Sequence, residues 1–178
     1  ISSKKAYHFF INRLLLNKLM INKKHNLALL IITLLLSFST LSAQISIIPK
    51  PEFSKINKGD FSLPSSSNIS SVSEFESVAR YFQKQLLANY GFTSVINSNH
   101  KVSDIEFVKN NKLAYEAYEI NVLPNKITIT TASKAGATYA VTSLLQQFSF
   151  GKRSDSDIII ACFEVKDTPA YPWRGFML

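Results

Sequence analysis

The sequence predicts an α+β domain in which a mixed or antiparallel sheet carries two helices on one face. Two stretches, 73–91 and 134–148, repeat apolar residues at three- and four-residue steps, as amphipathic helices do. The segments before, between and after them alternate apolar and polar residues, as half-buried strands do. Two helices of similar size among short strands give one sheet with a covered face. The domain is expected to span 44–166.

The residues before this domain are expected to be a leader. A basic start at Met20, a mainly apolar run over 27–36 and a small-residue end predict a secretory signal peptide over 20–43 that is cut after Ala43. The run is too short to cross a bilayer as a helix, which takes about 20 residues. Residues 1–19 are interpreted as translated upstream sequence. The product is expected to be exported, to the periplasm or outside the cell, and an uncleaved membrane anchor is the alternative.

The first strands of the mature chain are expected at its start. Residues 45–48 form a short apolar segment followed by two prolines, which predicts a strand at a sheet edge because proline cannot donate to a ladder. Phe61 and Leu63 alternate with polar neighbours and predict a second strand. The serine-rich stretch 65–68 is expected to be a loop.

The first helix is the most clearly marked element. Ser73 and Glu76 have the spacing of a capping box, in which the hydroxyl and the carboxylate satisfy two amides at the helix start. Gly91 stands where a helix commonly ends. The face expected to be buried consists of Phe75, Val78, Ala79, Phe82 and Leu86.

The rest of the chain is expected to complete the sheet and add the second helix. The turn Pro124-Asn125 separates two alternating segments and predicts a β-hairpin. The apolar side of the second helix is expected to contain Ala137, Ala140, Val141, Leu144, Leu145 and Phe148. The expected elements are strands at 93–96, 104–108, 118–122 and 127–130, a helix at 134–148, a solvated loop at 151–157 and a strand at 158–165.

Charge and composition exclude several classes of function. The net charge of +8 belongs mostly to residues 1–43, which hold six basic residues and no acidic one, whereas the rest holds 14 basic and 12 acidic residues. Without a basic stripe, nucleic-acid binding has no electrostatic basis. Cys162 is the only cysteine and is expected to pack as a small hydrophobe. His100 is the only histidine after the leader, and no metal site or cofactor is expected.

The end of the chain has a different character. Asp167 to Leu178 reads D-T-P-A-Y-P-W-R-G-F-M-L, in which two prolines keep the backbone extended and apolar residues then surround one cation, Arg174. This pattern predicts a linker followed by a buried strand with one functional charge. A guanidinium offers paired donors suited to neighbouring hydroxyl groups, so Arg174 is the candidate substrate-binding residue. Trp173 and Tyr171 could stack on a ligand, although core packing is the simpler interpretation.

This closing segment resembles the entry into the catalytic barrel of glycoside hydrolase family 20, the β-N-acetylhexosaminidases. The opening I-I-P-K-P at 47–51 with Gly59 and Phe61, and the hairpin and second helix over 118–146, are similar to the non-catalytic domain that precedes that barrel. The resemblance implies a zincin-like N-terminal domain over 44–166, then a linker and the first strand of a truncated (β/α)8 barrel over 167–178.

The resemblance also implies a reaction. Members of this family hydrolyse terminal N-acetylhexosamine residues by substrate-assisted retaining catalysis, in which an adjacent Asp-Glu pair acts on a substrate whose own acetamido group is the nucleophile. This chain has no Asp-Glu dipeptide, so no catalytic residue is expected in it and it is expected to be inactive alone. The matching arginine, Arg174, is implied to hold sugar hydroxyls of an N-acetylhexosamine-containing glycan.

Two other classes of function remain open from the residues alone. One is a free-standing carbohydrate-binding module, although no stripe of aromatic residues at strand spacing supports it. The other is a structural or interaction domain that braces a neighbour. A continuation of the reading frame containing an adjacent Asp-Glu pair would favour the hydrolase.

Overall fold

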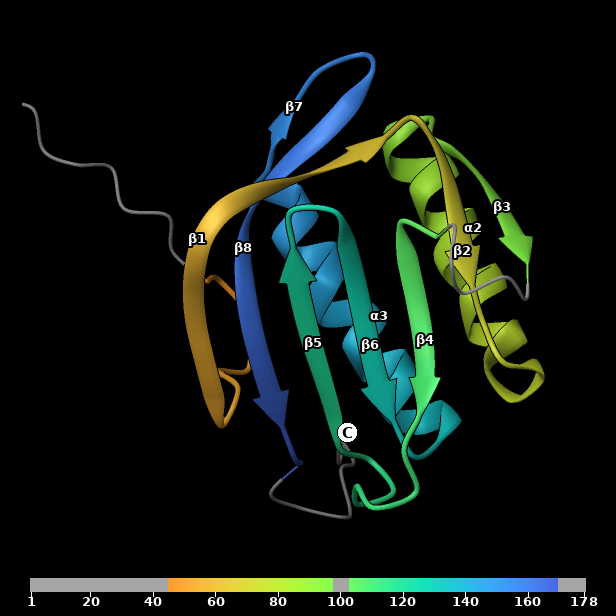
Figure 1. Ribbon diagram of the computed structural model, residues 1–178, viewed down its shortest axis with the longest axis vertical. Helices are drawn as coiled ribbons and strands as arrows, with labels where there is room; N and C mark the ends of the chain where they lie inside the picture. The colour runs from red at the N-terminus through yellow and green to blue at the C-terminus, as the bar shows by residue number, and fades with distance from the viewer. Residues whose placement is uncertain (1–44, 98–102, 170–178) are drawn as a thin grey trace, which may run out of the picture. The chain divides into compact units, whose positions relative to one another are not determined.

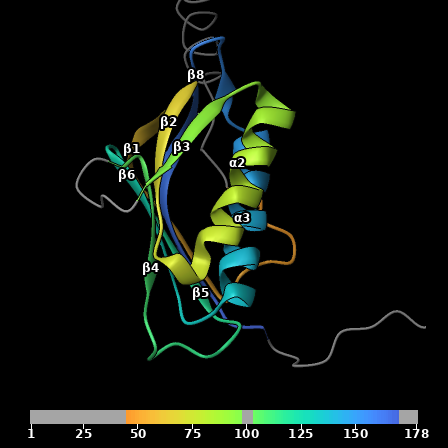
Figure 2. The same cartoon turned by 90° about the vertical axis from the view of Figure 1, so that its right-hand side faces the viewer.

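The computed structural model describes residues 45–97 and 103–169 and shows one sheet with two main helices (Figures 1 and 2). The leader, the candidate Arg174 with its neighbours Tyr171 and Trp173, and His100 lie outside the described residues. The elements are β1 (Phe53–Pro64), β2 (Ser66–Ser70), the 3-10 helix η1 (Ser73–Phe75), α2 (Glu76–Tyr90), β3 (Thr93–Asn97), β4 (Ile105–Lys109), β5 (Tyr118–Leu123), β6 (Lys126–Thr131), α3 (Lys134–Ser149), β7 (Lys152–Arg153) and β8 (Asp157–Asp167).

The sheet is mixed, and its strand order is β1-β8-β5-β6-β4-β2-β3, with the short β7 added to β8. One half, from β1 to β6, is antiparallel, whereas β4 pairs in parallel with β6 and with β2, and β3 pairs in parallel with β2. Both main helices lie on one side of the sheet, and the other side is open (Figure 2). The predicted α+β architecture with two helices on one face is therefore confirmed.

The core lies between the sheet and the helices. All five residues predicted for the buried face of the first helix are buried, and Phe82 of α2 stacks on Phe148 of α3 with ring centroids 6.3 Å apart. Of the residues predicted for the second helix, Leu145 is only partly buried and the others are buried. Gly91 ends α2 with a φ of 73°, in the left-handed region that glycine adopts without cost, as predicted.

The predicted hairpin is present as β5 and β6. Tyr118, Ile120 and Val122 of β5 are buried and alternate with more exposed neighbours, and Ile127 and Ile129 face the core from β6. α3 approaches the beginning of β5 closely because Gly136 has no side chain. A Cβ there would lie 2.5 Å from the carbonyl oxygen of Ala117 and would overlap Thr131 Oγ1.

Three local predictions were wrong. Residues 65–68 are not a loop, because 66–70 form β2, which pairs in parallel with β3 and β4 and buries Ile69. Residues 45–48 are not a strand, because the side chain of Gln146 binds the backbone of Ile48 in place of a ladder. The stretch 151–157 is not a loop throughout, since β7 adds two residues to β8.

The predicted capping box is also wrong. Ser73 begins the 3-10 helix η1, and neither η1 nor α2 has a side-chain hydrogen bond at its N-cap. Glu76 instead accepts hydrogen bonds from the guanidinium of Arg80 one turn later, at 3.1 Å and 2.6 Å. The paired charges are half exposed, so this pair adds only a few tenths of a kcal/mol to the helix.

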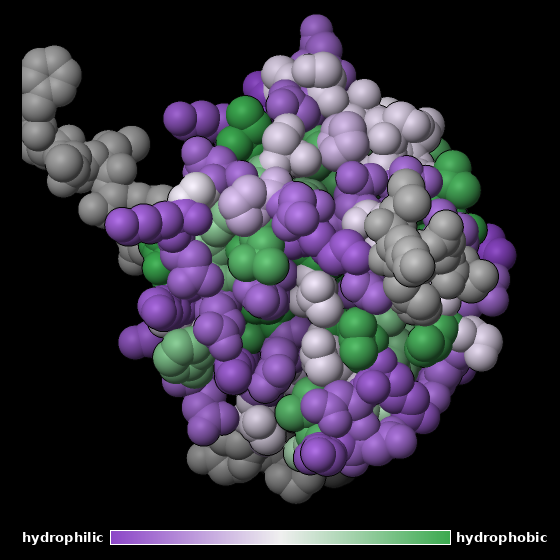
Figure 3. Space-filling model, in the orientation of Figure 1, coloured by the Kyte–Doolittle hydropathy of each residue, from purple (hydrophilic) through white to green (hydrophobic). Residues whose placement is uncertain are grey.

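The open face of the sheet is polar (Figure 3). Its charged side chains pair across strands: Lys126 Nζ on β6 lies 3.1 Å from Glu106 Oε2 on β4, and Lys166 on β8 lies near two glutamates. Cys162 is buried and burial raises the pKa of its thiol, as expected for a packed cysteine. Among the described residues, no helix is long and apolar enough to cross a membrane.

Candidate functional site

The candidate site is the end of β8, where the chain leaves the sheet toward Arg174. β8 ends at Asp167, and Thr168 and Pro169 are the last described residues. Arg174 was predicted to bind substrate and lies outside the described residues, so its position is not tested. The structure describes the end of β8 and the two residues that follow it, Thr168 and Pro169.

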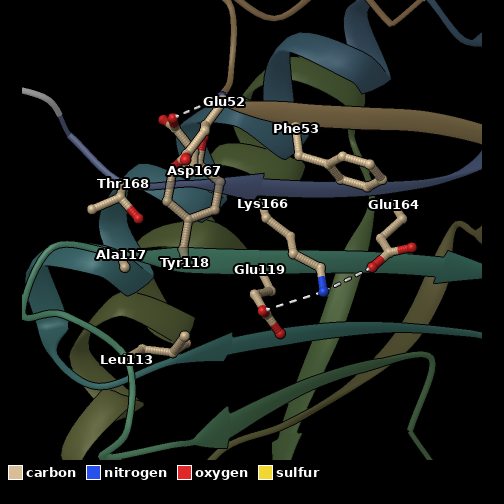
Figure 4. Close-up of a pocket in the computed structure, with 10 residues that line it drawn as sticks. All are labelled: Glu52, Phe53, Leu113, Ala117, Tyr118, Glu119, Glu164, Lys166, Asp167 and Thr168. Atoms are coloured by element: carbon tan, nitrogen blue, oxygen red, sulfur yellow. Dashed lines mark hydrogen bonds and ion pairs between the residues drawn. The ribbon is translucent and has the colours of Figure 1, made fainter.

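Three strands reach this point together. Asp167 of β8 is paired with Tyr118, the first residue of β5, and Lys166 is paired with Phe53, the first residue of β1. The backbone N–H of Glu52 donates a hydrogen bond to Asp167 Oδ1 at 3.2 Å, which ties the start of β1 to the end of β8. Figure 4 shows Tyr118, Asp167 and Glu52 grouped at this end of the sheet. The carboxylate of Asp167 thus ties β8 to the start of β1, whereas backbone pairing ties β8 to β5.

Tyr118 connects this point to α3. Its side chain is buried, and its hydroxyl lies 2.8 Å from the Oγ of Ser143, which is also buried. Burial raises the pKa of Tyr118 to about 12; the hydrogen bond with Ser143 opposes the rise, and the negative charge of Asp167 adds to it. The phenol therefore stays neutral and serves as a hydrogen-bonding group rather than as a base.

The segment before β1 is held against α3 a short distance away. The N–H of Ile48 donates to Gln146 Oε1 at 2.8 Å, and Gln146 Nε2 donates to the carbonyl oxygen of Ile48 at 3.1 Å. Ile47 is buried beside this pair, whereas Ile48 is exposed. The segment 45–52 is therefore fixed at both ends, by Gln146 near its start and by Asp167 at its finish.

Two hollows flank the end of β8. One, of about 510 Å³, lies between β1, β5 and β8 and is drawn in Figure 4. The other, of about 730 Å³, lies between the segment 45–52, α3 and the residues after β8, and Tyr139 and Pro169 are among its lining residues. Glu52, Tyr118, Asp167 and Thr168 line both hollows.

The first hollow is charged. Lys166 Nζ lies 3.2 Å from Glu164 Oε1 and 3.6 Å from Glu119 Oε1 (Figure 4). The hydrogen bond that Lys166 donates to Glu164 and the charges of Glu119 and Glu164 raise the pKa of Lys166, which therefore stays protonated. One cation between two carboxylates leaves an excess of negative charge, with Glu52 and Asp167 nearby.

No catalytic constellation is visible among residues 45–97 and 103–169. No group of three or more His, Cys, Asp and Glu side chains in these ranges could hold a metal ion. Asp155 and Asp157, read from the sequence as solvated charges, lie at the opposite end of β8. Hydrogen bonds from Ser154 and Ser62 lower the pKa of Asp157. Because Ser62 belongs to β1, its hydrogen bond also joins β8 to β1.

Sequence reasoning missed the junction at Asp167. From the sequence, Asp167 was assigned to the start of the linker. Its partners, Glu52 and Tyr118, are remote in the sequence, and no local pattern connects them with it. The only available signal was the change from strand alternation to proline-rich sequence directly after Asp167.

Comparison with known proteins relates most of the described residues to one family. The model of a protein family described as glycosyl hydrolase family 20, domain 2, matches residues 44–168. A beta-hexosaminidase of Vibrio furnissii is 29% identical over 144 residues, which is 79% of this chain and 22% of that protein.

Solved structures of related enzymes are also similar to this chain. An exo β-N-acetylglucosaminidase of Vibrio harveyi, crystallised with N-acetylglucosamine, superposes with a TM-score of 0.64 at 26% identity, over 75% of this chain and 20% of that one. A β-N-acetylhexosaminidase of Bacteroides fragilis gives a TM-score of 0.64 at 26% identity, over 73% of this chain and 26% of that one. The chain therefore spans about a fifth to a quarter of the length of these relatives.

Proposed function

This chain belongs to glycosyl hydrolase family 20, and from this membership we propose that it is the N-terminal part of an exported β-N-acetylhexosaminidase. The observation that carries the proposal is the family match over 44–168, which covers nearly all the described residues. The whole enzyme would remove terminal N-acetylhexosamine residues from a glycan. In this proposal 44–166 is the non-catalytic domain and 167–178 begins the barrel.

The length of the relatives supports assigning catalysis to a part of the enzyme other than the described domain. This chain covers 20–22% of the two Vibrio proteins, so most of such an enzyme would lie in further sequence. The chain has no Asp-Glu dipeptide, and the described residues hold no cluster of His, Cys, Asp and Glu side chains that could bind a metal ion. We therefore assign the Asp-Glu pair of substrate-assisted catalysis to the barrel, and binding of the sugar hydroxyls in part to Arg174.

The geometry at the end of β8 suits this assignment of Arg174. Six residues lie between it and Asp167, and the seven residue steps from one to the other span at most about 25 Å. Asp167 is held by β1 and β5. In this proposal the site that includes Arg174 lies within about 25 Å of Asp167.

An activity assay tests the proposal. The longer polypeptide encoded by the gene, purified after export, is expected to release p-nitrophenol from p-nitrophenyl N-acetyl-β-glucosaminide, whereas residues 44–178 alone are expected to release none above a buffer control. Replacing Arg174 by Ala in the longer polypeptide is expected to raise KM about tenfold or more, since a guanidinium bound to two hydroxyls contributes roughly 1.5–3 kcal/mol.

Two outcomes would contradict the proposal. One is a longer polypeptide that is folded but inactive on β-linked N-acetylglucosamine and N-acetylgalactosamine substrates. The other is a reading frame that stops directly after Leu178, which would favour a carbohydrate-binding or structural domain. Secretion is tested separately, by N-terminal sequencing of the exported product, which is expected to begin at Gln44.

A further inference from the structure

We infer that Ile48, which Gln146 holds against α3, is an anchor on which a second domain of the same polypeptide docks, an inference that rests on the proposed function. The occupant is the domain into which the chain continues after Pro169. Its contacting surface is expected to be apolar and uncharged. The docking surface on this side is called the α3 face and consists of Ile48, Pro49, Thr138, Thr142, Leu145 and Gln146.

The first support is the way in which Ile48 is presented. Its side chain is 81% exposed, more than any other large apolar side chain among the described residues. Yet its N–H and its carbonyl oxygen both bind the side-chain amide of Gln146, at 2.8 Å and 3.1 Å, and the preceding Ile47 is buried. The backbone of Ile48 is therefore fixed while its side chain stays in contact with water. A partner that covers it gains the free energy of apolar burial and pays little to order it.

The second support is the lack of charge on α3. A helix at a protein surface usually carries charged residues on its outer side, and α2 does so, because Glu76, Arg80 and Lys84 are all exposed. In contrast, α3 has no charged residue after Lys134, its first residue. Depletion of charge distinguishes the core of a protein interface from the rest of a surface. The outer side of α3 therefore has the composition of an interface.

The open face of the sheet has the opposite character. Lys126 pairs there with Glu106, and Lys166 pairs with Glu119 and Glu164. A domain docked on this face would remove water from these charges, at a cost that their mutual attraction often fails to repay. The second domain is therefore expected on the helix side of the sheet (Figure 2).

The course of the chain identifies the occupant. Ile48 and Pro169 both line the hollow of about 730 Å³ between the segment 45–52 and α3, so the chain that follows Pro169 starts beside the α3 face. In the proposed function most of the enzyme follows there, because this chain covers only 20–22% of the two Vibrio proteins. A short connection gives a tethered domain an effective concentration on the order of millimolar, so this domain reaches the α3 face before any separate partner.

Hydroxyl-radical footprinting of the longer polypeptide tests the inference, with oxidation measured for each residue by mass spectrometry. Ile48 is expected to be oxidised several-fold less than Val95, although Val95 is less exposed in this domain, at 59%. Val95 is the matched control because it is also β-branched and lies on β3, at the edge of the sheet opposite β1. Oxidation of Ile48 equal to that of Val95 or greater would overturn the inference.

Charged substitutions in the longer polypeptide test the docking from two positions. Ile48→Asp is expected to raise the oxidation of Leu145, which is partly buried in this domain, and Thr142→Lys is expected to raise that of Ile48, each several-fold. Both substitutions are at exposed positions. Val95→Asp, the control, should leave both values as in the wild type. Unchanged oxidation in Ile48→Asp and Thr142→Lys would contradict the inference.

The buried Phe82 reports whether a variant has unfolded. Its oxidation is expected to stay at the wild-type level in every variant. If it rises in one variant, the other variant and the comparison of Ile48 with Val95 in the wild type decide.

Activity measurements separate this inference from the proposed function. An active enzyme in which Ile48 is oxidised as readily as Val95 refutes the docking and leaves the function intact. A folded but inactive polypeptide in which Ile48 is protected refutes the function and supports the docking. Protection that disappears on dilution, together with a dimer in sedimentation, would place a second copy on the α3 face and overturn the inference.

Discussion

At the scale of single residues, the buried Tyr118 shows how one hydroxyl links elements that are distant in sequence. It begins β5, binds Ser143 on α3, and lies beside Asp167 at the end of β8. Its neutral form is favoured in the folded state, because burial raises its pKa to about 12 from a usual value near 10.

This shift predicts a loss of stability at high pH. The stabilisation is fully present below pH 10 and is lost as pH rises from 10 to 12, because the unfolded chain releases the phenolic proton first. Between pH 9.5 and 11.5 the wild type should lose about 2 kcal/mol more in free energy of unfolding than Tyr118→Phe, which lacks the group. Urea unfolding of residues 44–178 at both pH values measures the difference.

The control for this prediction is Tyr115→Phe, because Tyr115 is 72% exposed. Equal pH dependence in Tyr118→Phe and the wild type would contradict the assignment.

At the scale of elements, the sequence predicted the helices and strands that have a local apolar periodicity. It failed for segments whose structure depends on residues far away in the sequence. Helices α2 and α3 and the hairpin of β5 and β6 follow from periodicity, because their apolar faces are continuous in the chain. Residues 65–68 look like a loop by composition, yet parallel neighbours on both sides make 66–70 a strand. The segment 45–48 looks like a strand, yet Gln146, some hundred residues later, takes its hydrogen bonds.

The packing of α3 on the hairpin gives a prediction for Gly136. Replacing it by Ala places a methyl group against Ala117 and Thr131 and is expected to destabilise residues 44–178 by about 1–3 kcal/mol, as other overpacked substitutions do. Thr138→Ala, an exposed change one half-turn later on the same helix, should alter stability by less than about 0.5 kcal/mol. Urea titrations measure both, and equal stabilities would refute the steric argument.

At the scale of the whole domain, β2 and β3 are joined to the rest of the sheet by a short seam, which is the pairing of β2 with β4. β2 and β4 pair only at Ile69 with Ile105 and at Ser70 with Glu106. Asp104 extends the seam: its N–H donates to the carbonyl oxygen of Asn68 at 2.9 Å, and its Oδ2 accepts from the N–H of Asn68 at 2.7 Å. By contrast, β5 and β6 pair over six residues each.

This seam predicts unequal protection across the domain. In native-state hydrogen exchange, amides of β2 and β3 should open at lower free energy than those of β5 and β6. Asp104→Ala leaves the Asn68 amide without its acceptor and should lower the opening free energy of β2 and β3 by about 1–2 kcal/mol. Asp104→Asn retains an acceptor oxygen and is the matched control, and uniform exchange in all strands would contradict the prediction.

The candidate site shows the limit of sequence reasoning for the molecule as a whole. Arg174 could be proposed because its motif is contiguous. The contacts at the end of β8 could not, because Glu52, Tyr118 and Asp167 come from three separate parts of the sequence and meet only after the sheet has formed. Contiguous signals identify the family and a candidate residue, whereas the contacts of Asp167 depend on tertiary structure.

The pairing of β1 with β8 affects how the domain folds during its synthesis. β1 is the first strand to leave the ribosome, and among the described strands its ladder partner is β8, the last. A nascent chain therefore carries an unmatched edge until almost the whole domain has been translated. Productive folding must wait for the final strand, and any chaperone that protects this domain during synthesis has its first strand as the segment to shield.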